Sequence, residues 1–271
     1  MRREVQAALL VLGTTAIAVA CGDVPTFPQG ITFITPIIAP SPSVAYGDTL
    51  RDSLGRAAPL RVFAFGRDTA DTIRTVTVRY LLTTIDSGAG ARTTIDRDGF
   101  LVADSVLRTL RIVAQVTDGT SNSAFRLQTN ELSIDVVPRA DSIARTTSTE
   151  IAGTLPIVAP LSVTITGVGP AGRGVVPGIR VRYRIVETFP ALPLSGRYYL
   201  TDDAGNVLRP DSTVALDTTN ASGIASRSFV GLAARDGGAN ADSVLVQAEA
   251  SSHANVPLRG SRVRFVVKLR R

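Results

Sequence analysis

Apolar and polar residues alternate in several segments of this chain. In residues 179–185, apolar side chains occupy the odd positions and arginines occupy the even ones. The same period of two appears in residues 75–80 and 262–269. Successive side chains of a strand point to opposite faces, so each segment predicts a strand that covers a core on one side only. No segment beyond the N-terminal region shows comparable helical periodicity, which predicts an all-β fold with antiparallel sheets stacked as a sandwich or closed as a barrel.

Two halves of the chain repeat the same features in the same order. Val78-Arg79-Tyr80 recurs as Val181-Arg182-Tyr183, and the turn sequence 96–100 has its counterpart in 219–224. Each half then continues with two further predicted strands, at 110–114 and 132–137 in the first half and at 244–248 and 262–269 in the second. An internal repeat of this kind favours two tandem β-sandwiches over one barrel.

The second half is longer than the first between its tyrosine and its turn. We expect the additional residues to form a hairpin around 198–207 with its turn at 203–206. Loops tolerate change while sandwich strands are used by the core, so the insert 189–208 is the predicted binding surface. Its expected contact residues are Tyr198, Tyr199, Asp202 and Asp203. Neighbouring strand positions face opposite sides, so no more than one of the two tyrosines should be exposed.

The N-terminus has the pattern of a secretion signal. A basic start at Arg2 and Arg3 is followed by the uncharged, mostly apolar residues 5–20, which are too few to cross a bilayer as a helix. The only cysteine, Cys21, follows Ala18-Val19-Ala20. This resembles the bacterial lipobox, with Ala18 where leucine is usual. The resemblance implies a leader over residues 1–20 and lipid on Cys21, whereas the alternative is an unmodified cysteine in an ordinary signal peptide.

The region after Cys21 is predicted to be extended. Residues 21–43 contain five prolines, which disfavour helix and suit a linker. Residues 31–38 could instead form a first edge strand, where prolines are tolerated, and both interpretations stay open. The first sandwich is then expected over residues 44–138 and the second, with its inserted hairpin, over residues 139–271. With a single cysteine, no intrachain disulfide can form.

Composition and charge narrow the class of protein. Hydrophobic content of 44% with charged content of 19% is typical of a folded globular chain. The net charge of +6 comes from arginines scattered singly along strands rather than gathered into a run. We therefore expect no nucleic-acid partner.

Short turn-and-strand signatures link the chain to a known family. Gly47-Asp48-Thr49-Leu50, residues 95–99 and residues 217–225 resemble bacterial immunoglobulin-like domains, the modules of invasin- and intimin-type adhesins and of many surface lipoproteins. The resemblance implies two tandem immunoglobulin-like sandwiches without catalytic activity. The chain has no Trp, so the Cys-Trp-Cys core of antibody domains is missing.

Two motifs carry potential ligand chemistry. Residues 167–172 match the glycine-rich dinucleotide fingerprint, but residues 173–178 contain glycines and a proline and should not begin the helix that the fingerprint needs. We expect a flexible loop between strands there. The acidic clusters 96–99 and 202–206 supply too few oxygens for a calcium loop, so Asx turns are the preferred interpretation, with calcium left open.

The inventory of reactive side chains argues against an enzyme. His253, the only histidine, is expected to be solvent-exposed in a loop between the last two strands. One His, one Lys and one Cys cannot assemble a multi-histidine metal site or a free thiol nucleophile. We therefore expect no catalytic residues, no metal site and no cofactor.

These observations predict a non-enzymatic surface or periplasmic lipoprotein of the bacterial envelope, with the outer membrane or cell surface as its expected location. Its lipid would hold it to the membrane, and its tandem domains would act as a spacer and binding module for an unknown protein or glycan, with adhesion as one use. The alternative is an accessory subunit of an envelope or polysaccharide-handling complex.

Overall fold

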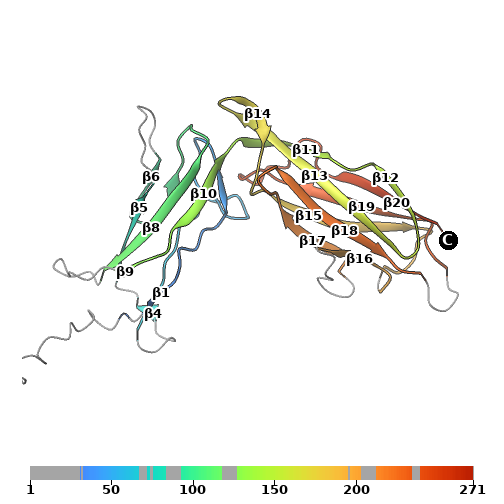
Figure 1. Cartoon of the computed structure of the whole chain (residues 1–271), viewed down its shortest axis with the longest axis horizontal. Helices are drawn as coiled ribbons and strands as arrows, with labels where there is room; N and C mark the ends of the chain where they lie inside the picture. Colours follow the sequence, from blue (N-terminus) through green and yellow to red (C-terminus); the bar gives the residue numbers. More distant parts are fainter. Residues whose placement is uncertain are drawn as a thin grey trace, which may run out of the picture.

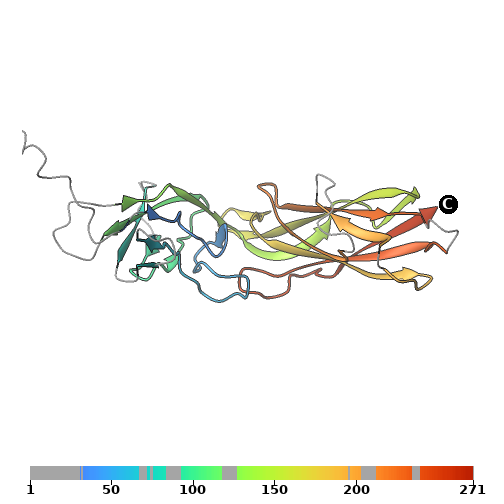
Figure 2. The same ribbon diagram turned by 90° about the horizontal axis from the view of Figure 1, so that it is seen from below.

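The computed structural model of the chain describes residues 31, 33–66, 72–73, 76–83, 93–117, 127–194, 196–202, 212–233 and 239–270. Across these ranges the regular structure is all strand. None of the described residues belongs to a helix long and apolar enough to cross a membrane. The strands form two sandwiches that lie end to end (Figure 1), and a view turned by 90° shows the elongated outline of the pair (Figure 2).

The first domain is built from short strands around one continuous sheet. Its strands are β1 (Phe33–Ile34), β2 (Ser43–Ala45), β3 (Ala64–Phe65), β4 (Thr72–Ile73), β5 (Thr77–Leu82), β6 (Thr94–Ile95), β7 (Leu101–Val102), β8 (Thr109–Thr117), β9 (Leu127–Gln128) and β10 (Leu132–Val137). The main sheet has the order β2-β10-β8-β5, with β9 paired to β8. Its remaining strands form the small β1-β3-β4 sheet and the β6-β7 hairpin.

The second domain has longer strands in two full sheets. Its strands are β11 (Arg139–Arg145), β12 (Glu150–Thr154), β13 (Ile157–Gly169), β14 (Gly172–Val175), β15 (Arg180–Phe189), β16 (Tyr198–Thr201), β17 (Val214–Thr218), β18 (Ile224–Gly231), β19 (Ser243–Ala250) and β20 (Val263–Arg270). One sheet has the order β11-β13-β18-β16, with β14 paired to β13, and the other has the order β12-β20-β19-β15-β17.

The strand order is that of an immunoglobulin-like sandwich. In the second domain the two sheets correspond to the A-B-E-D and G-F-C sheets of an immunoglobulin domain. In both domains an early strand pairs in parallel with the last one, β2 with β10 and β12 with β20. The chain departs from the usual order once, because β16 joins the first sheet before β17 joins the second. The predicted pair of immunoglobulin-like sandwiches is confirmed.

The period-two pattern explains why these segments are strands. Along β13, alternate side chains are buried throughout its 13 residues. In β15, Val181, Tyr183 and Ile185 are buried, and the arginines between them are exposed. The repeated tyrosines also share one role, because the hydroxyl of Tyr80 donates to the Leu60 carbonyl and that of Tyr183 donates to the Ala225 carbonyl, both at 2.8 Å. Each tyrosine thereby ties its strand to the opposite side of its sandwich.

The repeated turns are also equivalent in the two domains. Oδ1 of Asp96 accepts hydrogen bonds from the backbone N–H groups of Asp98 and Phe100, and Oδ1 of Asn220 does the same for Ser222 and Ile224. The fourth position is a glycine with a left-handed backbone in both turns, with φ of 88° at 99 and 69° at 223. The Asx-turn interpretation of residues 96–99 is confirmed.

Residue 31 and residues 33–43, expected to lie within the linker, form part of the first domain. Strand β1 pairs with β3, and Ile31 and Ile37 are buried in its core. Of the two interpretations of residues 31–38, the structure supports the edge strand, because β1 lies at the edge of the β1-β3-β4 sheet. Burial of these two isoleucines is the physical reason, since an extended linker would leave both side chains in water.

One expectation for the second domain needs correction, and another is tested only in part. Residues 167–172 are not a flexible loop, because β13 and β14 pair as far as Gly169 and Gly172 and leave a tight two-residue turn. Strand β16 pairs with β18, and its alternate residues Tyr198 and Leu200 are buried in the core, so the first arm of the expected hairpin is part of a sheet. The turn predicted at 203–206 lies outside the described residues.

Candidate functional site

The junction between the two domains is short. Strand β10 ends at Val137 and β11 begins at Arg139, so Pro138 alone connects the two sandwiches. The guanidinium of Arg139 stands 5.0 Å from the centre of the Tyr46 ring, and its Nε donates to the Tyr46 carbonyl at 3.3 Å. A one-residue connection with side-chain contacts across it restricts how far one domain can turn against the other.

Two turns of the same design meet at this junction. In residues 52–56 and 252–256, the first backbone N–H donates to the fifth carbonyl, at 2.9 and 2.8 Å. Gly55 and Asn255 hold the left-handed fourth position, with φ of 77° and 59°. A Cβ placed on Gly55 would lie 2.6 Å from the carbonyl carbon of Ala254. The tips of the turns are therefore in backbone contact, and Figure 2 shows the two loops side by side.

A buried serine and the only histidine join the domains beside these turns. The Ser43 hydroxyl lies 3.2 Å from the Pro177 carbonyl and 3.0 Å from Nε2 of His253. When Ser43 donates to Pro177, Nε2 of His253 must carry the proton and donate to Ser43. Nδ1 is then an acceptor, and it is buried without a hydrogen-bond partner among the described residues. The expectation that His253 is a solvent-exposed loop residue is wrong, because its side chain is half-buried against Ser43 of the first domain.

The surroundings of His253 favour its neutral form. Burial lowers its pKa to about 4, Asp48 opposes this shift and Arg51 adds to it. Protonation would also place a second N–H donor at Nδ1, where no described acceptor lies. Asp48 is occupied locally, since its carboxylate accepts hydrogen bonds from Arg51 and from the Thr49 backbone. The Asp48 carboxyl pKa is lowered, because these hydrogen bonds and nearby charges outweigh its burial.

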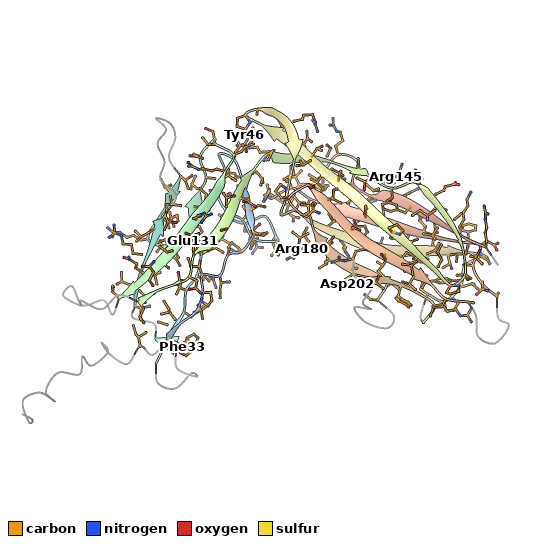
Figure 3. The ribbon with its side chains drawn as sticks, in the orientation of Figure 1. Phe33, Tyr46, Glu131, Arg145, Arg180 and Asp202 are labelled. Carbon is orange, nitrogen blue, oxygen red and sulfur yellow. The ribbon has the colours of Figure 1, made fainter. Side chains whose placement is uncertain are left out.

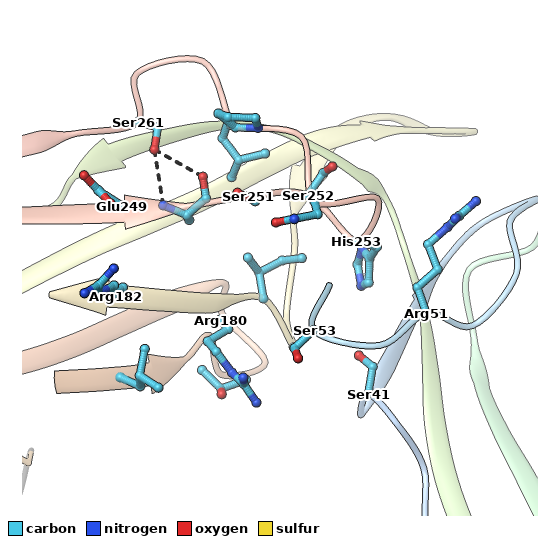
Figure 4. Close-up of a pocket in the computed structure, with 18 of the residues that line it drawn as sticks. Ser41, Arg51, Ser53, Arg180, Arg182, Glu249, Ser251, Ser252, His253 and Ser261 are labelled. Atoms are coloured by element: carbon cyan, nitrogen blue, oxygen red, sulfur yellow. Dashed lines mark hydrogen bonds between the residues drawn. The ribbon is translucent and has the colours of Figure 1, made fainter. Parts of the chain in front are cut away.

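A groove of about 730 Å³ opens between the domains next to this contact. Its first-domain wall consists of residues 40–42 and 51–53, and its second-domain wall includes residues 178–180, Arg182, residues 249–253 and residues 260–262. Figure 4 shows Ser41, Arg51 and Ser53 facing the arginines of β15 and the loop that carries His253. The charged side chains of the groove are Arg51, Asp52, Arg180, Arg182, Glu249 and Arg262.

The junction does not have the arrangement of a hydrolase. Ser43 and His253 have the separation of the first two members of a catalytic triad, but the third member is missing, because Nδ1 of His253 meets no carboxylate of the described residues. Ser43 is also only 1% exposed, so a substrate could not reach it. No group of three or more His, Cys, Asp or Glu side chains in the described ranges is placed to hold a metal ion.

The predicted binding residues lie elsewhere and do not act together. Tyr198 is fully buried, its ring stacks on Phe229 at 6.2 Å, and its hydroxyl accepts a hydrogen bond from the Ala241 N–H. A ligand contact by Tyr198 therefore does not fit the structure, whereas Tyr199 and Asp202 are half-buried. None of them lines the groove. Figure 3 labels Asp202 on the second domain. Asp203 and Cys21 lie outside the described residues.

The groove could not be predicted from the sequence, because the residues that line it are distant in the chain. Ser43 and His253 are 210 positions apart. The pattern of the arginines in β15 predicts only that they form the solvent-exposed face of a strand. One signal was available. The sequence 252–255 places Ser and Asn at the first and fourth positions of a turn, as Asp52 and Gly55 do in the first domain. Nothing local indicated that the two turns touch.

No family model matches the sequence, and no curated protein matches it significantly. Among solved structures, it is similar to the D0-D1 domain of intimin, with 14% identity over 88% of this chain and 96% of that chain at a TM-score of 0.24. It is also similar to Rst D1-D2, with 12% identity over 89% and 100% at a TM-score of 0.30. The fibronectin(III)-like modules of Clostridium thermocellum CbhA give 10% identity over 88% and 93% at 0.27. With such low TM-scores, the immunoglobulin-like assignment rests on the strand order.

Proposed function

We propose that this chain is a non-enzymatic envelope protein whose two immunoglobulin-like domains form one stiff spacer and binding module. The junction carries the proposal. A single connecting residue, the contact between the turns at Gly55 and Ala254, and the bond between Ser43 and His253 hold the sandwiches end to end. In this proposal, such a pair keeps a binding surface at a fixed distance from whatever anchors it.

The anchor is proposed to be lipid on Cys21, on the basis of the sequence alone. Two or more acyl chains make a durable membrane attachment, whereas one chain gives only a marginal one. Fractionation of cells that express the full chain tests this. We expect the wild type in the membrane fraction after a high-salt wash and Cys21→Ser in the soluble fraction. Equal membrane retention of both would reject the lipid anchor.

Affinity capture from membranes tests the binding role. Wild type and Cys21→Ser would be captured in parallel, since a genuine partner of the folded module should bind both, and a lipid-dependent contaminant only the first. A glycan array with the same two proteins tests the adhesion form of the proposal. Failure to retain any protein or glycan would leave the spacer role and remove the binding role.

A second function is favoured by an apolar patch on the second domain. Phe189 is 66% exposed and lines a shallow depression with Leu245 and Val266 on the β12-β20-β19-β15-β17 sheet. An exposed aromatic residue beside aliphatic ones is typical of a protein contact. We propose this patch as the contact surface if the chain is an accessory subunit of an envelope complex. Phe189→Ser should then abolish co-purification of a stable protein complex from membranes.

Tyr199 and Asp202 stay proposed contacts for the same class of partner. Strand β16 is the last strand of its sheet in the order observed. Tyr199→Ala and Asp202→Ala would weaken capture of a partner that binds at this edge, and Thr154→Ala on β12, an edge strand of the opposite sheet that lies outside the groove, is the control.

A further inference from the structure

The groove between the domains carries more positive than negative charge. Four arginines line it against two carboxylates, with Arg51 and Asp52 supplied by the first domain and Arg180, Arg182, Arg262 and Glu249 by the second. Both domains therefore contribute to one basic surface, which exists only while they are docked.

The arginines of β15 are the ones free to take a ligand. Arg51 is held by Asp48 at 2.9 Å, and Nε of Arg262 lies 3.8 Å from Glu249. Arg180 and Arg182 make no ion pair with any residue that the structure describes. Guanidinium groups bind carboxylate, phosphate and sulfate oxygens through two parallel hydrogen bonds. Glu249 lies opposite Arg182 on β19 without an ion pair to it, so an anion in the groove would give Arg180 and Arg182 partners that the described residues do not supply.

The spacing of the arginines suits a ligand with repeated negative charges. Arg180, Arg182 and Arg184 are all exposed on one face of β15, and residues two apart on a strand are separated by about 7 Å. On the same face, Gln247 of β19 pairs with Arg184 on one side and with Arg264 of β20 on the other. The basic surface therefore continues from the groove along the sheet, as a polymer would require.

The other lining residues distinguish between kinds of polyanion. Hydroxyl groups are abundant in the groove, on Ser41, Ser53, Thr218, Ser251, Ser252 and Ser261. Hydroxyls donate and accept hydrogen bonds, as the hydroxyls of a sugar do. The lining contains no Phe, Tyr or Trp on which a nucleobase could stack. These features favour a chain of acidic sugars over a single-stranded nucleic acid.

We propose that the interdomain groove binds an acidic polysaccharide, with Arg180 and Arg182 holding carboxylates of successive acidic sugars. This rests on the proposed role as a binding module and gives that role a ligand class. Hydroxyl-bearing side chains from both walls contact the sugar rings, and the ladder of cations on β15 guides the polymer out of the groove along the sheet.

Binding of an oligogalacturonate to the full chain, purified from membranes in detergent, tests the proposal by calorimetry. The double variant Arg180→Gln, Arg182→Gln should lose at least about tenfold in affinity, because the loss of even one charge-assisted hydrogen bond typically weakens binding by more than about tenfold. The matched control is Arg79→Gln. Arg79 is exposed in the equivalent tripeptide of β5 and lies outside the groove, so its removal should leave affinity unchanged. A neutral galactan oligomer should not bind, and added salt should weaken oligogalacturonate binding.

Three results would overturn the proposal. The first is an equal loss of oligogalacturonate affinity with Arg79→Gln and with the double variant, and the second is no loss of affinity with either. The third is tighter binding of an oligothymidylate than of the oligogalacturonate. Thermal unfolding of each variant, followed by circular dichroism, confirms that the exposed substitutions leave the fold intact. Membrane capture that still yields a partner while the oligogalacturonate fails to bind would reject the groove's ligand and keep the binding-module function. Failure of both would reject the binding role as well and leave the spacer role.

Discussion

The two sandwiches share a strand order and a turn design, yet they hold together by different means. The second has strands of up to 13 residues and one continuous core, in which Tyr183, Tyr198, Phe229 and Phe265 are fully buried. In the described part of the first, several strands have two residues, the core divides into two clusters, and its fully buried large side chains are all Leu or Ile. One topology therefore tolerates very different amounts of core.

The difference indicates how the two domains depend on each other. Aromatic side chains bury more apolar area than aliphatic ones, so the second domain has the larger driving force for folding. The first domain supplies Ser43 and Gly55 to the junction, and both contacts end on the loops of the second. We infer that docking stabilises the first domain more than the second.

The largest effect is expected from Phe265→Ala. This fully buried residue of β20 packs in the single core of the second domain, and its truncation should cost about 4 kcal/mol. Hydrogen exchange resolved by mass spectrometry measures each domain separately, and protection should fall most in the second domain. Phe189→Ala, at a side chain that is 66% exposed, is the control and should change stability by less than about 0.5 kcal/mol. Equal losses would show that the second core does not dominate.

The next effect is a pH dependence of docking. Burial lowers the pKa of His253 to about 4 from 6.5, so a form in which the first domain no longer covers this side chain should take up the proton first as the pH falls. The free energy that stabilises docking should be complete above pH 6.5 and should decrease progressively down to pH 4. The total loss should be on the order of 3 kcal/mol. The melting temperature of the first domain, followed between pH 7 and pH 4, measures this. His253→Gln should remove that part of the pH dependence, and parallel curves for wild type and variant would contradict the assignment.

A smaller effect is expected from Gly55→Ala. A side chain at this left-handed position costs about 1 kcal/mol, and its contact with the Ala254 backbone should add a similar or larger amount. Gly172→Ala is the matched control, because Gly172 also has a positive φ but its Cβ would meet nothing within 4 Å. Small-angle X-ray scattering should show a less extended, more variable domain pair only for Gly55→Ala. The same scattering profile for both variants would mean that the turn contact does not hold the domains.

The smallest effect compares the two repeated tyrosines. Tyr183→Phe removes a fully buried hydrogen bond to Ala225 and should cost about 1.5 kcal/mol. Tyr80→Phe removes the equivalent bond to Leu60 from a half-buried site and should cost about 0.5 kcal/mol. Burial raises the pKa of Tyr80 to about 12, so its hydroxyl stays protonated in any ordinary buffer. Urea unfolding followed by tyrosine fluorescence ranks the two, and a larger loss for Tyr80→Phe would reverse the proposed order of core strength.

The sequence by itself determined the local structure of this protein. Alternation at residues 179–185 specified a strand with one buried face, and the turn sequences 96–100 and 219–224 specified the hydrogen bonds of their own backbones. Such features depend on residues within a few positions of one another. They were sufficient to predict an all-β chain with two repeated sandwiches.

Only the tertiary structure decided the junction and the candidate site. It placed Tyr198 in the core, moved His253 from solvent to a covered position against Ser43, and turned the arginines of β15 into one wall of a groove. The environment of each depends on residues far away in the chain or on the other domain. A pattern of neighbouring residues carries no information about such partners, because burial and charge at a site are set by whatever the whole fold brings against it.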